Sequence, residues 1–192
     1  MTEQRKKKFL SVLSHRQPTL TLVMEDIHDP HNVSAMLRSA DAVGVMEVNL
    51  IYVNDQFPKL GKKSSASAKK WIAKQSFTSV RECYDALHEK GFLICATHLG
   101  RRSKSLYELD LTKKIALVFG NEHRGVSDEA AELADVNFQI PMMGMIQSLN
   151  VSVACAVSLY EALRQRKKVG MYDAPVLPQA AIRKLFKEWG KR

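Results

Sequence analysis

Three stretches of the sequence gather residue types that could bind a ligand or stabilise charge. The first runs from His28 to Arg38 and contains Asn32, a candidate helix cap, six residues before Arg38. On a helix these two side chains lie nearly two turns apart, so both could point at the same edge of a sheet. Taken alone, a helix cap followed by a surface arginine explains the stretch at least as well as a functional role.

The second stretch is a polar loop bounded by glycines, between an apolar run and a helical segment. It spans Gly120–Gly125 and contains an amide, an acid and an arginine. The glycines permit close backbone approach or positive φ. The loop could be a tight turn with a local Glu122–Arg124 pair, but loops held by a rigid strand commonly carry sites, which favours function. Neither the Walker motif nor the Gly-x-Gly-x-x-Gly fingerprint is matched.

The third stretch is a methionine-rich loop followed by a helical segment with a polar start. The loop spans Ile140–Ile146, and Ser148, Asn150 and Ser152 open the segment that follows. The segment is apolar nearly all round, which indicates burial. Its small residues permit close packing against another element, for which a second copy of the chain is one candidate. The methionines could form an adaptable pocket for a flat heterocycle, because methionine packs against irregular shapes.

The elements that must position these stretches alternate along the chain. Expected strands are Leu20–Met24, Glu47–Val53, Phe92–Thr97, Ile115–Phe119 and Asn137–Ile140. Expected helices are Asn32–Ala42, Val80–Lys90, Asp128–Ala134 and Leu149–Gln165. The alternation, with runs that are apolar on both faces, predicts an α/β doubly wound parallel sheet. Ligands bind beyond the carboxyl ends of such strands, and the polar segments found there could build one site: Asp26–Arg38, Thr97–Arg102, Gly120–Gly125 and Pro141–Asn150.

The net charge of +9 is concentrated at the two ends of the chain. Residues 1–20 carry five Lys/Arg and one Glu, and residues 161–192 carry nine Lys/Arg and three acids. Both ends mix basic with apolar residues at helical spacing. Such helices flanking a near-neutral domain suggest contact with a polyanion, either nucleic acid or an anionic membrane surface.

Composition also favours some classes of protein over others. No apolar stretch approaches the roughly 18 residues that span a bilayer, and the N-terminus has no signal-peptide apolar region. We therefore expect no membrane partner and a cytoplasmic location. Cys83, Cys95 and Cys155 form no C-x-x-C pair and are expected to be buried structural thiols. The histidines lack ligand spacing, so no metal site is predicted.

All three stretches resemble the SPOUT superfamily of S-adenosylmethionine-dependent methyltransferases, in its TrmH-type branch of RNA ribose 2′-O-methyltransferases. The N-x-x-x-x-x-R element matches Asn32 and Arg38, F-G-N-E-x-x-G-[VI] matches residues 119–126, and I-P-M-x-G-x-x-Q-S-L-N-V-S-V-A matches residues 140–154. The likeness covers roughly residues 5–175. Arg16–Thr21 and Glu161–Tyr172 look like the branch that modifies guanosine 18 in the tRNA D-loop, whereas the rRNA branch typically has an extra N-terminal RNA-binding domain.

The resemblance implies a parallel sheet flanked by helices, with a Rossmann-like N-terminal half and a deep C-terminal trefoil knot. It implies a methyltransferase domain at residues 19–168 with basic extensions at residues 1–18 and 169–192. It also implies an obligate homodimer packed through the knot helices, in which Arg38 could serve the partner's site. The S-adenosyl-L-methionine pocket would be lined by Thr97, His98, Leu99, Gly120, Ile140, Met145, Ser148 and Leu149.

The resemblance further implies four catalytic residues. Arg38 would fix the ribose phosphate and stabilise oxyanion charge; it would not act as a base, because a guanidinium has a pKa above about 12. Glu122 would orient Arg38 or the substrate, Asn32 would hold its own loop, and Asn150 would link the loops. Contacts to tRNA are expected from Arg5, Lys6, Lys7, Lys8, Arg16, Lys62, Lys63, Arg124, Arg164, Arg166, Lys167 and Lys168.

Three functional hypotheses follow. The favoured one is a tRNA guanosine-18 2′-O-methyltransferase. The second keeps this chemistry but places it on rRNA or on another tRNA position. The third is a catalytically silent RNA-binding dimer, against which the intact Asn32, Arg38, Glu122 and Asn150 argue.

Overall fold

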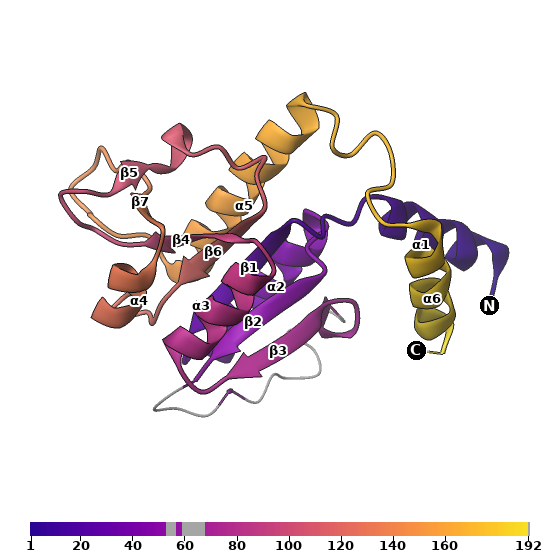
Figure 1. The fold of residues 1–192 in the computed structure, drawn as a ribbon, viewed down its shortest axis with the longest axis horizontal. Helices are drawn as coiled ribbons and strands as arrows, with labels where there is room; N and C mark the ends of the chain where they lie inside the picture. The colour runs from indigo at the N-terminus through magenta and orange to yellow at the C-terminus, as the bar shows by residue number, and fades with distance from the viewer. Residues whose placement is uncertain (53–56, 59–67, 192) are drawn as a thin grey trace.

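The fold is a parallel sheet with helices on both faces (Figure 1). The computed structural model describes residues 1–52, 57–58 and 68–191, without the side chain of Lys69. Within these ranges the strands are β1 (Leu20–Glu25), β2 (Glu47–Ile51), β3 (Ala73–Phe77), β4 (Leu93–Thr97), β5 (Lys104–Ser105), β6 (Ile115–Phe119) and β7 (Val136–Gln139). The helices are α1 (Glu3–Ser14), α2 (Pro30–Ala42), α3 (Val80–Glu89), α4 (Asp128–Leu133), α5 (Val151–Lys168) and α6 (Gln179–Gly190), with 3₁₀ turns η1 (Ala68–Lys70) and η2 (Leu106–Glu108).

The strands pair in the order β3-β2-β1-β6-β4-β7-β5, and each pair is parallel. Helices α2 and α5 pack against one face, and α3 and α4 against the other. Leu22 and Met24 of β1 lie in the hydrophobic core on the face covered by α2 and α5, whereas Val23 lies in the core on the face covered by α3 and α4. Because both faces are covered, every residue of β6 is buried, as its continuous apolar run predicts.

The path of the chain from β4 to β7 brings the loops of the candidate site together. The chain leaves β4, forms β5 two places further along the sheet, returns to β6, and later inserts β7 between β4 and β5. Residues 140–150 then lead from β7 to α5, which packs on α2. This brings the loops after β4, β6 and β7 together at the carboxyl ends of their strands. The trefoil knot implied by the resemblance stays a prediction.

Local sequence signals fix most helix ends. Ser79 caps α3 by accepting the Glu82 N–H, and Ser127 caps α4 by accepting the Ala130 N–H. The expectation that Asn32 caps α2 is wrong. Asp29 is the N-cap, its carboxylate accepts the His31 N–H at 2.8 Å, and the helix begins at Pro30. Asn32 therefore lies inside the first turn with its side chain free for another partner.

The two chain ends pack together beside the sheet (Figure 1). Helices α1 and α6 share a small apolar core in which the rings of Phe9 and Trp189 lie 5.6 Å apart. Arg16 joins this core to α2 and to the segment between α2 and β2: its guanidinium lies 5.3 Å from the Trp189 ring and donates to the Asp41 carboxylate and the Val45 carbonyl, each at 2.7 Å. Arg16 is 1% exposed, so its predicted contact with RNA is wrong.

The three cysteines are buried, as predicted. Burial raises the pKa of Cys83 and of Cys95 to about 12, so both thiols stay protonated and unreactive at neutral pH. Within the described ranges, no helix combines the length and the apolar character needed to cross a membrane.

Candidate active site

A cavity of about 590 Å³ opens at the carboxyl ends of β4, β6 and β7. This volume is in the range of small-molecule sites. The segments that line it are residues 97–99 after β4, 119–126 and Asp128 after β6, 138–140 and Met142 at the end of β7, and residues 147–151 with Ala154 at the start of α5. The cavity lies where ligands bind in open α/β sheets, as predicted.

The loop after β6 is a tight turn whose residues line the cavity. The Gly125 N–H donates to the Asn121 carbonyl at 2.8 Å, and Gly125 has a φ of +74°, which favours glycine. The Asn121 side chain accepts the His123 N–H at 2.9 Å. At Gly120 a β-carbon would lie 2.2 Å from the Gly125 carbonyl group and from the Val126 nitrogen. Gly120 is therefore required for the close approach of the two ends of this loop.

A chain of side-chain hydrogen bonds joins the cavity to α2. Asn150 Nδ2 donates to Asn32 Oδ1 at 3.1 Å, and Asn32 Nδ2 donates to Glu122 Oε1 at 2.9 Å. Asn150 also caps α5, because its Oδ1 accepts the Ser152 N–H at 2.9 Å. These three residues, here called the Asn–Asn–Glu chain, connect three segments that lie far apart in the sequence.

Glu122 holds the loop after β1 in place. Its Oε2 accepts the His28 N–H and its Oε1 accepts the Asp29 N–H, both at 3.1 Å. Burial by itself raises the pKa of Glu122, but the hydrogen bonds from Asn32 and from the backbone outweigh it, so the pKa lies below its ordinary value. The carboxylate is therefore charged at neutral pH, and all of these donors stabilise that charge.

Arg38 lies apart from the Asn–Asn–Glu chain. It is on the exposed face of α2, and it makes no hydrogen bond or ion pair with the rest of the described residues. In the single chain Glu122 does not orient Arg38, because the Glu122 oxygens accept hydrogen bonds from the loop after β1. The local Glu122–Arg124 pair is also absent from the described contacts, since Arg124 is ion-paired with Asp26 instead.

The structure brings together most of the residues predicted to bind a cofactor. Met145 is the exception: it is 97% exposed and does not line the cavity. Those that do line it are Thr97, His98, Leu99, Gly120, Ile140, Ser148 and Leu149. Sequence reasoning missed the walls formed by Phe138, Gln139 and Val151. Val151 directly follows a predicted loop, and Phe138 and Gln139 lie in the predicted strand before it, so extending the loop into its flanking elements would have found them.

The residues predicted to contact RNA are dispersed in structure. Arg5, Lys7 and Lys8 are exposed on α1, and Lys167 and Lys168 are exposed in the last turn of α5. Three others are already paired: Lys6 with Glu3, Arg164 with Glu161, and Arg124 with Asp26. Lys62 and Lys63 lie outside the described residues.

Arg166 is fully buried, so its predicted RNA contact is wrong. Its guanidinium donates five hydrogen bonds, to the Leu111, Thr19 and Lys113 carbonyls, the Thr19 hydroxyl and the Gln17 side chain, at 2.7–3.1 Å. Burial lowers the pKa of Arg166 to about 10, which leaves it protonated at neutral pH. Arg166 is therefore a structural residue.

Comparison with known proteins identifies the family to which the chain belongs. Residues 19–160, which hold every segment of the cavity, match the SpoU rRNA Methylase family. The chain belongs to this family. It is 44% identical over 188 residues to the tRNA (guanosine(18)-2′-O)-methyltransferase of Thermus thermophilus, covering 98% of this chain and 96% of the relative.

Solved structures of the family share the fold. The crystal structure of the A. aeolicus TrmH/SpoU tRNA modifying enzyme superposes with a TM-score of 0.91 at 39% identity, covering 97% of this chain and 95% of that one. The SpoU methyltransferase AviRb from Streptomyces viridochromogenes, in complex with the cofactor AdoMet, superposes with a TM-score of 0.68 at 27% identity, covering 81% and 64%.

The close approach at Gly120 gives a first prediction. A Gly120→Ala substitution should weaken S-adenosylmethionine binding about tenfold or more, because the new β-carbon forces the backbone at Gly125 away and reshapes the cavity. Calorimetric titration with the cofactor measures this. Gly190→Ala on α6 is the control, since a β-carbon there meets nothing within 4 Å and the residue does not line the cavity. Equal affinities for the Gly120→Ala protein and the unchanged chain would show that the loop tolerates the shift.

Proposed function

We propose that this chain is an S-adenosylmethionine-dependent ribose 2′-O-methyltransferase that modifies guanosine 18 of tRNA. The observation that carries the proposal is the Asn–Asn–Glu chain, which ties the cavity to the helix that carries Arg38. The match to the Thermus relative extends over nearly the whole chain, including α1 and α6. That extent favours tRNA over rRNA as the substrate.

The residues of the cavity fit the cofactor. Leu99, Ile140 and Leu149 offer apolar walls to a flat heterocycle, and residues of the tight turn after β6 line the same cavity. The Thr97 hydroxyl donates to the Val118 carbonyl at 3.0 Å and so keeps the start of the loop after β4 in place. When bound, S-adenosylmethionine supplies an electrophilic methyl group.

The chain's own residues position the ribose. The Asn–Asn–Glu chain fixes the loop after β1 and the start of α2, and hence the place of Arg38 relative to the cavity. Arg38 is unpaired among the described residues, so its guanidinium is available to hold the ribose phosphate and to stabilise negative charge developing on the 2′-oxygen. A phosphate oxygen of the substrate is the proposed acceptor of the 2′-hydroxyl proton.

We propose that the enzyme works as a homodimer. Large apolar side chains are exposed in the loop after β7 and on α5: Met143, Met145, Ile146, Val153 and Tyr160. Several large apolar side chains exposed in two neighbouring segments indicate an interface, and a second copy of the chain is the partner that a closed symmetric assembly provides. The exposed Arg38 on the neighbouring helix α2 could then serve the partner's cavity.

Basic residues on α1, on the last turn of α5 and on α6 are the proposed tRNA surface. We expect the enzyme to act in the cytoplasm, where tRNA is found.

Methyl transfer from labelled S-adenosylmethionine tests the proposed function. Incubated with unfractionated tRNA and with rRNA in parallel, the enzyme should transfer label to tRNA. Label in rRNA alone would favour the alternative substrate, and label in neither would support a silent RNA-binding dimer.

A further inference from the structure

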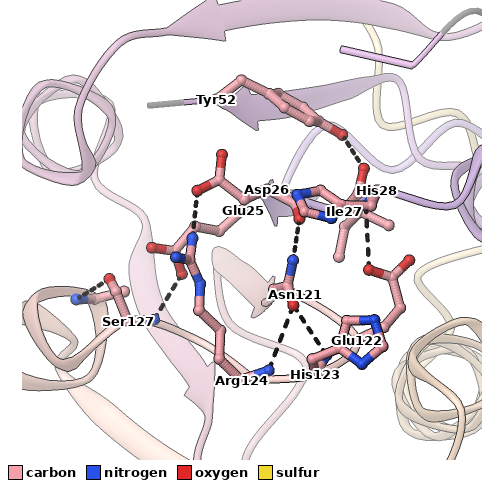
Figure 2. A network of polar contacts seen from close by, with 11 residues as sticks. Glu25, Asp26, Ile27, His28, Tyr52, Asn121, Glu122, His123, Arg124 and Ser127 are labelled. Carbon is pink, nitrogen blue, oxygen red and sulfur yellow. Dashed lines mark hydrogen bonds and ion pairs between the residues drawn. The ribbon is translucent and has the colours of Figure 1, made fainter. Parts of the chain in front are cut away.

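The loop after β6 is fastened to the end of β1 by contacts outside the Asn–Asn–Glu chain (Figure 2). The Arg124 guanidinium is ion-paired with the Asp26 carboxylate. Asn121 Nδ2 donates to the Asp26 carbonyl at 2.9 Å, and the Ser127 N–H donates to Glu25 Oε2 at 3.0 Å. Glu25 and Asp26 are 2% and 1% exposed. Two consecutive buried acids therefore hold three positions of the loop that lines the cavity.

Asp26 is also the corner at which the chain leaves β1. Its φ is +47°, a left-handed conformation that aspartate and asparagine adopt more readily than most residues. Its N–H donates to the Ile51 carbonyl at 2.9 Å. The backbone N–H groups of His28 and Asp29, which bind Glu122, follow within three residues. The position of Asp26 thus sets where those N–H groups point.

The burial of Asp26 gives a physical reason for the ion pair. A buried carboxylate is costly unless charged and polar partners compensate for lost water. Arg124 supplies one such partner from a half-exposed position, where its side chain is 48% exposed. Because its charge is balanced by Asp26, Arg124 is poorly suited to the phosphate contact that sequence alone suggests.

We propose that Asp26 and Arg124 are positioning residues for methyl transfer. Their ion pair keeps the loop after β6 in register with the loop after β1, so that Glu122 meets both its backbone donors and Asn32. A displacement of about 1 Å in such a constellation can cost about 10²-fold in rate, without contact between the displaced residue and the reacting atoms. This inference rests on the proposed function, since register matters to a reaction at this site.

Two substitutions and their combination test the pair. Asp26→Asn removes the carboxylate, and asparagine, like aspartate, adopts a positive φ more readily than most residues. Arg124→Ala removes the other partner and leaves the backbone at Asp26 unaltered. Each should lower the single-turnover rate at saturating tRNA and cofactor about tenfold. Affinity for tRNA should stay within about twofold, with an unchanged dependence on salt. The double variant should be no slower than the slower single variant, because the two side chains act as one unit.

Hydrogen exchange gives a readout that does not require activity. The Asn121 side chain accepts the backbone N–H groups of His123 and Arg124, at 2.9 and 3.4 Å. In both single variants these amides should exchange faster than in the unchanged chain. Arg124→Lys, which keeps the positive charge, should recover part of the rate. Arg81→Ala, which removes an exposed arginine from α3, should change neither the rate nor the exchange.

Three results would overturn the inference. One is an unchanged rate with weaker tRNA binding and a salt slope reduced by about one, as expected for a phosphate contact. Another is a double variant whose loss is the product of the two single losses. The third is unchanged exchange at residues 123–124. If the unchanged chain transfers no methyl group to tRNA, the proposed function fails instead, and the exchange experiment still decides whether the pair holds the loop.

Discussion

Replacing Arg38 with alanine is expected to reduce the single-turnover rate of methyl transfer by about 10²–10³-fold, the loss typical of removing one donor that stabilises developing negative charge. Affinity for S-adenosylmethionine should stay unchanged, because Arg38 does not line the cavity. Stability should also be preserved, since the side chain is exposed and unpaired among the described residues. Rapid-quench methylation and cofactor calorimetry measure the two quantities separately.

A mixing experiment extends this prediction to the dimer. Arg38→Ala subunits are combined with Gly120→Ala subunits at a cofactor concentration too low to fill the Gly120→Ala cavity, so that each homodimer turns over slowly on its own. If Arg38 serves the partner's cavity, a mixed dimer contains one intact site and regains turnover. Failure to regain turnover, with mixed dimers demonstrated, would place Arg38 and its cavity in the same chain. A normal single-turnover rate for the Arg38→Ala homodimer would contradict the role given to Arg38.

Replacing Arg166 with alanine is expected to lower the free energy of unfolding by about 3–5 kcal/mol. The substitution removes five hydrogen bonds and leaves the Leu111 and Lys113 carbonyls without this donor. It also opens a gap between α5, the N-terminal side of β1 and the segment before β6. Chemical denaturation measures the loss, and the melting temperature should fall by roughly 10 °C.

Lys167→Ala is the matched control, because it removes an exposed basic residue from the same helical turn. It should leave stability within about 0.5 kcal/mol of the unchanged chain. If Arg166→Ala instead unfolded like the unchanged chain and bound tRNA more weakly, Arg166 would be a phosphate contact, as its sequence context suggests, and the buried arrangement would not persist in solution.

The pattern of apolar runs predicts the central elements of the fold. Strand β6 has the predicted bounds, and β1 and β4 differ by one residue at one end. The edge strand β3 was not predicted, because Lys74, Ser76 and their exposed neighbours give it no apolar run. The order of the strands could not be predicted either, since β7 is inserted between two strands that precede it, and no local pattern encodes that path.

The site was predictable where residues carry short motifs and unpredictable where their partners are distant. Asn32, Glu122 and Asn150 stand out in the sequence, but their mutual hydrogen bonds span 90 and 118 positions. The predicted RNA contacts of Arg16 and Arg166 were wrong because their positive charge alone suggested an exposed phosphate-binding role. Backbone carbonyls, which have no signature in a sequence, accept hydrogen bonds from both guanidinium groups, so the buried arginines could not be told from exposed ones.

Nucleoside mapping of the product tests the central claim most directly. tRNA transcript is methylated with the purified enzyme, digested to nucleosides and to defined fragments, and analysed by mass spectrometry. We predict one 2′-O-methylguanosine, in the fragment that contains position 18 of the D-loop. A methyl group on a base, or no methyl group in the presence of bound cofactor, would contradict the account in which this cavity presents a methyl group to a ribose oxygen.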